Sequence, residues 1–97
     1  MRFTVTWTSE ADADLAQRWL TLGSEDQRHL SLCVDHIDAA LRQNAHQKGA
    51  ALRGHEPLRV YGAPPFFGQP PVGVVYEVSA EDRLVRVLEL WILEEPV

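Results

Sequence analysis

The sequence predicts an α+β fold in the order β-α-α-β-β-β, with an antiparallel sheet packed on an N-terminal helical hairpin. Three observations support this prediction. The first residues alternate between apolar and polar side chains, as in a half-buried strand. Two amphipathic helical segments follow, joined by only one or two residues, and the second half of the chain carries three strand-like segments.

The first strand is predicted because Phe3, Val5 and Trp7 alternate with threonines. Thr8 or Ser9 can cap the helix that follows, and acidic residues lie near its positively charged end. A glycine ends this helix. One face of the helix collects its apolar side chains, which are Ala11, Leu15, Trp19 and Leu22.

The second helix begins at Ser24, and the glutamine three positions later, Gln27, gives the segment the form of a capping box. We expect this helix to run to about Asn44. Cys33 lies beside its apolar stripe and is expected to be a small buried hydrophobic residue. The stripe itself has helical spacing and comprises Leu30, Val34, Ile37 and Leu41.

Three strands are predicted after residues 45–56, where the periodicity is lost. The first is short and covers residues 58–61. The other two, residues 72–78 and 84–93, are nearly continuous apolar runs separated by a turn at 79–82. Such runs are typical of central strands that are covered on both sides or paired at an interface.

The composition indicates one domain, residues 1–97, in a soluble cytoplasmic protein. The sequence has one cysteine, no apolar run long enough to span a membrane and no signal peptide. Its net charge of −5 argues against strong nucleic-acid binding, which depends mainly on lysine and arginine at phosphates.

The histidines and the cysteine show no metal-binding spacing. His29 and His36 lie seven residues apart, two helical turns, which is too far to bind one ion directly. The sequence contains no H-x-x-x-H or C-x-x-C motif, and we expect neither a metal nor a cofactor.

Three segments in this order resemble the RelE/ParE toxin superfamily of bacterial toxin–antitoxin systems. They are F-T-V-T-W-T-S-E-A at 3–11, H-I-D-A-A-L at 36–41, and P-V-G-V-V-Y-E-V…D-R-L-V-R-V-L-E-L-W at 71–91. The resemblance covers nearly the whole chain. It implies a toxin, of the kind associated with plasmid stabilisation, that a cognate antitoxin wraps and neutralises. RelE-like members cleave messenger RNA on the ribosome, whereas ParE-like members poison DNA gyrase.

The sequence departs from the nuclease branch at two places. An arginine usually precedes the x-V-Y segment of the third strand in that branch, and the matching residue here is Gly73. A basic residue and an aromatic acid–base group usually follow the last strand, where this chain has Glu94 and Glu95. Two carboxylates would repel a phosphodiester, so we predict that the chain is not a ribonuclease.

If the chain does cleave RNA, the candidate catalytic residues are Arg59, Tyr61 and Arg83. Arg59 could bind a phosphate, or it could form an ion pair across the sheet with Glu77 or Glu89. Tyr61 could donate a proton only if its pKa were lowered.

Two apolar segments are candidate partner-binding sites. The proline-rich loop 62–71 holds Phe66 and Phe67 on a stiff backbone, where they either close the core or anchor an interface. The last strand, if it is an edge, would invite strand addition by a partner. Its candidate contact residues are Trp91, Ile92 and Leu93.

A basic patch is predicted from residues 39–55, which contain Arg42, Lys48 and Arg53 and no acid. These cations could meet a phosphate backbone or an acidic antitoxin segment. Alternatively, Arg42 and Lys48 complement the negative end of the second helix.

Three functional hypotheses remain open from the sequence. The first is a toxin that binds its antitoxin and acts on a protein such as DNA gyrase. The second is a weak ribosome-dependent endoribonuclease. The third is a non-toxic interaction module that forms a homodimer.

Overall fold

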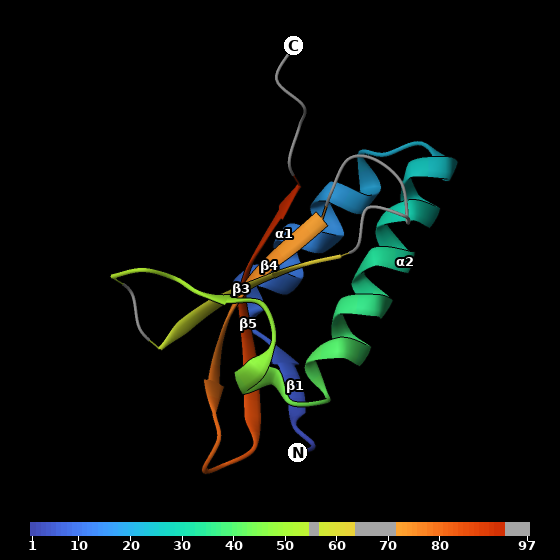
Figure 1. The fold of residues 1–97 in the computed structure, drawn as a ribbon. Helices are drawn as coiled ribbons and strands as arrows, with labels where there is room; N and C mark the ends of the chain where they lie inside the picture. Colours follow the sequence, from blue (N-terminus) through green and yellow to red (C-terminus); the bar gives the residue numbers. More distant parts are fainter. Residues whose placement is uncertain (55–56, 64–71, 93–97) are drawn as a thin grey trace.

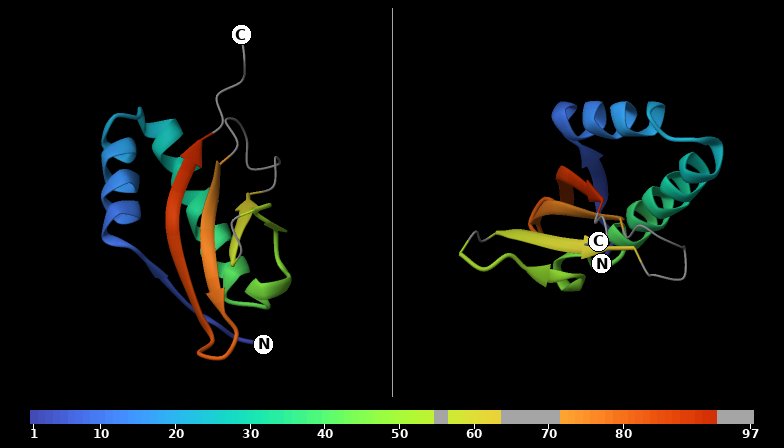
Figure 2. Two further views of the ribbon diagram at one scale, coloured as in Figure 1. Left: turned by 90° about the vertical axis from the view of Figure 1, so that its left-hand side faces the viewer. Right: turned by 90° about the horizontal axis from the view of Figure 1, so that it is seen from above.

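The computed structural model describes residues 1–54, 57–63 and 72–92. Within these ranges the chain forms one five-stranded sheet and two long helices, and both helices lie on the same face of the sheet (Figures 1 and 2). The helices are α1 (Ser9–Leu20) and α2 (Ser24–Leu41), followed by a short 3-10 turn, η1 (Ala45–Gln47). Helix α1 packs on β5, and α2 packs on β4.

The strand order across the sheet is β1-β5-β4-β3-β2. Strand β1 pairs with β5 in parallel, and the other neighbours pair antiparallel. The strands are β1 (Thr4–Trp7), β2 (Ala50–Ala51), β3 (Leu58–Gly62), β4 (Val72–Ser79) and β5 (Leu84–Ile92).

The predicted α+β fold class is confirmed, with three corrections to the sheet. It is mixed, not wholly antiparallel, because the edge strand β1 pairs parallel to β5. The aperiodic segment contributes a two-residue edge strand, β2. The last strand is not an edge over Leu84–Val87, where β5 lies between β1 and β4, but beyond Val87 the described residues pair it with β4 alone. Strand addition is therefore excluded at Leu84–Val87, and at Trp91 and Ile92 it stays a prediction.

Helix α1 begins as predicted. The hydroxyl oxygen of Thr8 accepts a hydrogen bond from the Ala11 amide at 3.2 Å, which satisfies one of the first free N–H groups of the helix. Ala11 is buried, but Trp19 at the other end of the predicted apolar face is 40 % exposed. The Trp19 indole N–H donates to the Ser31 hydroxyl, which links α1 to α2.

Helix α2 has no capping box. Its N-cap is Gly23, which makes no side-chain cap, and Ser24 is already the first helical residue. The Gln27 side-chain amide (Nε2) instead donates to the Trp19 carbonyl at 2.9 Å, so it closes the end of α1 rather than the start of α2. The helix ends at Leu41, before the predicted Asn44. Among the described residues neither helix is long and apolar enough to span a membrane.

The core lies between the helices and one face of the sheet. On the helix side Leu30, Ile37 and Leu41 of the predicted stripe are buried together with Cys33, and Val34 is partly buried. A β-bulge opposite Val75 and Tyr76 makes Leu88 an extra residue in β5, so Val87 and Leu90, three apart, both face the helices. The sheet residues of this core are Val72, Val74, Tyr76, Val85, Val87 and Leu90.

Candidate functional site

Arg59 is tied to the backbone of a neighbouring loop. Its Nε donates to the Lys48 carbonyl at 2.9 Å, and one terminal nitrogen lies 3.5 Å from the Gly49 carbonyl. The predicted ion pair with Glu77 or Glu89 is wrong. Register explains why: Arg59 pairs with Tyr76 on the helix-facing side of the sheet, whereas both glutamates belong to the other face.

Tyr61 lies on the same face as Arg59 and reaches helix α2. Its hydroxyl is 3.0 Å from Nε2 of His36, and the two rings stack with centroids 6.1 Å apart. Burial raises the pKa of the Tyr61 phenol. A catalytic proton donor would need the opposite shift, so this environment does not suit that role.

Arg83 lies in a different part of the fold from Arg59 and Tyr61. It sits in the β4–β5 turn with a left-handed φ of 51°, and its carbonyl accepts from the Thr4 amide. It lines a hollow with Arg2 and Arg42, whereas Arg59 lines a different one. The structure therefore does not bring the three nuclease candidates together.

The position of the expected nuclease arginine is filled by an aromatic ring. Gly73 is buried and pairs with Trp91 on β5. A Cβ added at Gly73 would lie 2.1 Å from Cζ2 of the Trp91 indole. Real side-chain carbons do not approach this closely, so no side chain fits at residue 73 unless Trp91 moves.

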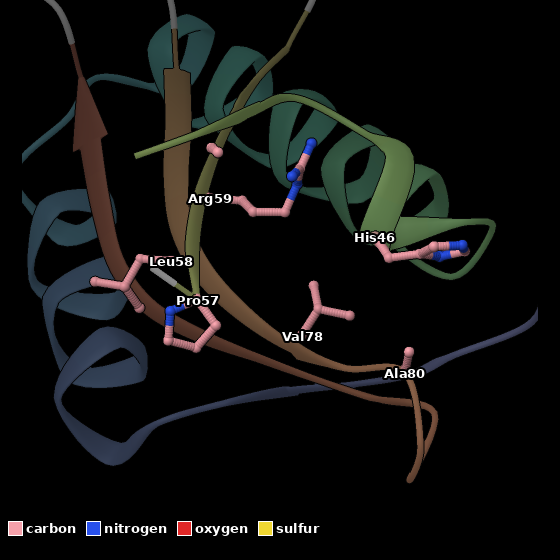
Figure 3. A pocket seen from close by; sticks show the side chains of 7 residues that line it. His46, Pro57, Leu58, Arg59, Val78 and Ala80 are labelled. Carbon is pink, nitrogen blue, oxygen red and sulfur yellow. The ribbon is translucent and has the colours of Figure 1, made fainter. Parts of the chain in front are cut away.

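The hollow beside Arg59 has a volume of about 270 Å³ and lies between β3, the end of β4 and η1 (Figure 3). In Figure 3, Leu58 and Arg59 leave β3 on opposite sides, as strand alternation requires. His46 also lines the hollow and was not among the predicted candidates. Its Nδ1 is buried and has no hydrogen-bond partner within the described residues, and its ring packs on Phe3 with centroids 5.4 Å apart.

Tyr76 has a structural role. Its hydroxyl lies 3.0 Å from the Ala45 carbonyl and 2.8 Å from the Lys48 carbonyl, and its one proton donates to either. Burial raises the pKa of this phenol, and the Arg59 guanidinium offsets part of the rise. Together, Tyr76 and Arg59 attach the loop after α2 to the sheet.

The predicted basic patch is divided between different places. Arg42 caps α2 and forms an ion pair with Asp38 at 2.7 Å, which fits the predicted alternative of stabilising the helix end. Lys48 contributes its carbonyl to the contacts of Arg59 and Tyr76. Arg53 is exposed in the loop after β2.

Cys33 is 1 % exposed, as predicted, and burial raises the pKa of its thiol. A thiol in this state is a poor nucleophile, even though Sγ lies 3.7 Å from Nε2 of His29. Residues 1–54, 57–63 and 72–92 contain no cluster of three or more metal-ligating side chains.

The predicted partner-binding residues are only partly within the described structure. Trp91 and Ile92 lie on opposite faces of β5: Trp91 crosses Gly73, and Ile92 packs against the core under the helices. Phe66, Phe67 and Leu93 lie outside the described residues.

The face of the sheet away from the helices carries apolar side chains that are only half-buried. An ion pair between Arg86 and Glu77, at 2.8 Å, lies among them. No helix within the described residues lies on this face (Figure 2). We call it the open face, and its apolar members are Leu58, Val60, Val75, Leu84, Leu88 and Trp91.

The fold is similar to solved toxin–antitoxin proteins. The chain matches the chromosomal ParDE toxin–antitoxin system from P. aeruginosa with a TM-score of 0.70 and 18 % identity, over 96 % of this chain and 98 % of that one. It matches a free-state mutant of the E. coli toxin RelE with a TM-score of 0.61 and 17 % identity, over 93 % and 82 %.

A third match is the archaeal RelE–RelB complex from Pyrococcus horikoshii, with a TM-score of 0.56 and 18 % identity over 95 % of this chain and 96 % of that one. No protein-family model and no curated protein matches the sequence. At these identities the similarity concerns the path of the backbone, which agrees over nearly the full length. The chain therefore has the fold of the RelE/ParE toxin superfamily.

Proposed function

We propose that this chain is the toxin-like component of a type II toxin–antitoxin system, acts by protein contact rather than RNA cleavage, and is neutralised by a cognate antitoxin. In this proposal it is a single-domain, soluble cytoplasmic protein. The observation that carries the proposal is the Trp91 ring lying across Gly73, where a nuclease of this fold would need an arginine.

The state of the remaining nuclease candidates supports the same proposal. Cleavage of a phosphodiester requires free positive charge and a proton donor directed at one phosphate. Arg59 donates to backbone carbonyls, and Tyr61 contacts His36 with a raised pKa. Arg83 lines a separate hollow. Arg59 and Tyr61 are thus engaged in contacts that hold the fold, and Arg83 lies apart from them.

We propose the open face as the surface that contacts the antitoxin. Burying an apolar surface on binding costs less desolvation than burying a charged one, and the Arg86–Glu77 ion pair on this face offers a polar contact. Solved proteins with this fold include complexes of RelE with RelB from E. coli and from P. horikoshii, which makes a partner protein a reasonable occupant.

The first test is toxicity and its chemistry. Induced expression in a bacterial host should arrest growth, and co-expression of the product of a short adjacent reading frame should restore it. Transcripts should show no ribosome-dependent cuts, and a DNA gyrase supercoiling assay tests the ParE-like target. Replacing Arg59 and Tyr61 together with Ala should leave toxicity intact in folded protein. Ribosome-dependent cleavage that the double variant loses would overturn the proposal.

The second test is the contact surface. Val75→Asp places a charge on the open face, and it should weaken binding of the adjacent frame's product by about tenfold or more. Leu32→Asp is the matched control, because Leu32 is an apolar residue of α2 that is 48 % exposed on the other layer. If Leu32→Asp weakens binding and Val75→Asp does not, the helices form the interface and the open-face assignment fails.

A further inference from the structure

A hollow of about 460 Å³ is lined by residues of the N-terminal segment, the β4–β5 turn and the end of α2. These three segments lie at the same end of the molecule (Figure 1). Three arginines from three distant parts of the chain line it: Arg2, Arg42 and Arg83. This grouping cannot be predicted from sequence patterns, because residues 2, 42 and 83 come together only in the folded chain.

Backbone hydrogen bonds fix the positions from which these side chains extend. The Phe3 amide donates to the Arg42 carbonyl, and the Thr4 amide donates to the Arg83 carbonyl, both at 2.9 Å. Arg2 forms an isolated β-bridge with Gln43. Arg83 is held in the left-handed region, at φ 51°, which a side-chain-bearing residue adopts at some cost. The three segments thus form a preorganised frame.

The hollow has more positive charge than its own acids neutralise. Within the described residues, Arg42 pairs with Asp38, but neither Arg2 nor Arg83 lies within ion-pair distance of a carboxylate. Asp82 is the acid in the lining, and its Oδ2 is 3.2 Å from the Ser79 hydroxyl, which donates to it. An exposed guanidinium presents several N–H donors in a plane that matches a carboxylate or phosphate.

We propose that Arg2, Arg42 and Arg83 form a binding site for the carboxylates of an acidic protein segment. A protein segment fits better than a nucleic acid for two reasons. The chain's net charge of −5 repels a long polyanion, whereas a short acidic segment feels mainly the local arginines. Phe3, the aromatic residue of the lining, is 5 % exposed and cannot stack on a base. The site does not depend on the chain being a toxin.

A short polyglutamate peptide is the probe, titrated calorimetrically into the whole chain at low salt. Arg2→Gln and Arg83→Gln should each weaken binding by about fivefold, and their combination by more than about tenfold. Arg28→Gln is the matched control, because Arg28 is exposed on α2 and does not line the hollow. It should change the affinity by less than about twofold. Backbone amide NMR shifts should move at Thr4 and Arg83.

Other outcomes would overturn the site. If wild type does not bind the peptide, or if Arg28→Gln weakens binding as much as Arg83→Gln, the attraction is absent or diffuse. A thymidine oligonucleotide of the same charge is the competing probe. If it binds more tightly than the peptide with the same dependence on Arg2 and Arg83, the occupant is nucleic acid and the proposal is wrong. Urea midpoints of the variants verify that each is folded.

Discussion

The two faces of the sheet differ in what they contribute to stability and to binding. On the covered face Val74, Tyr76 and Val87 are fully buried under the helices. On the open face Val75 and Trp91 are half-buried, and an ion pair between Arg86 and Glu77 lies among apolar side chains. Stability therefore comes mainly from the covered face, and the open face can carry a binding function at a smaller cost in stability.

The largest expected difference comes from two adjacent valines of β4. Val74→Ala should lower the free energy of unfolding by about 2–3 kcal/mol, because it removes buried methyl groups and leaves a cavity. Val75→Ala, the same change one residue away on the open face, should cost less than about 1 kcal/mol. Urea unfolding of both variants measures the difference. Equal losses would mean that the open face is packed as tightly as the covered one.

The next effect concerns the close approach of Gly73 and Trp91 on the open face. Gly73→Ala should cost about 1–3 kcal/mol, because the new methyl group overlaps the Trp91 ring. Gly62→Ala is the matched control in the neighbouring strand, since its Cβ would meet only ordinary contacts at 3.8 and 3.9 Å. That control should be neutral or gain about 0.4–1 kcal/mol.

A Trp91→Ala background sharpens the Gly73 comparison. With the ring removed, Gly73→Ala should lose most of its cost, because the two changes act on one contact. The same urea experiment measures this coupling. An unchanged cost would show that Gly73 is required by its backbone and not by the ring.

The smallest effect is pH-dependent and comes from the covered face. Tyr76→Phe should cost about 0.5–1.5 kcal/mol near neutral pH, because the Ala45 and Lys48 carbonyls lose a donor. Burial raises the pKa of Tyr76 in the folded protein, so the unfolded chain loses its phenolic proton first as pH rises. The Tyr76 hydrogen bond therefore contributes its full stability below about pH 10, and this contribution is lost as the pH rises further. The gap between wild type and Tyr76→Phe should shrink over that range, and a widening gap would contradict the burial argument.

Local patterns in the sequence predicted the elements well. The helical stripe ending at Leu41, the strands of the second half and the core position of Cys33 are all found in the structure. Each depends on spacing within about a dozen residues, which a sequence displays directly.

What could not be predicted depends on long-range pairing. The Gln27 side chain donates to the Trp19 carbonyl at the end of α1 because the helical hairpin brings the two residues close. A local capping pattern does not reveal this contact. The strand register places Arg59 and Glu77 on opposite faces of the sheet. A shift of one residue would move every side chain of the strand to the other face. The arginine hollow likewise needs β1 to be placed beside β5 before it exists.

The parallel pairing of β1 with β5 also determines when the protein can fold. The Thr6 hydroxyl donates to the Val85 carbonyl across 79 positions of the chain. At about 5–20 residues per second, ribosomal synthesis of that interval takes roughly 4–16 s. During this delay β1 has no strand to pair with, and the helical hairpin has no complete sheet to cover. A nascent chain therefore cannot assemble either proposed binding surface before β5 (Leu84–Ile92) has been synthesised.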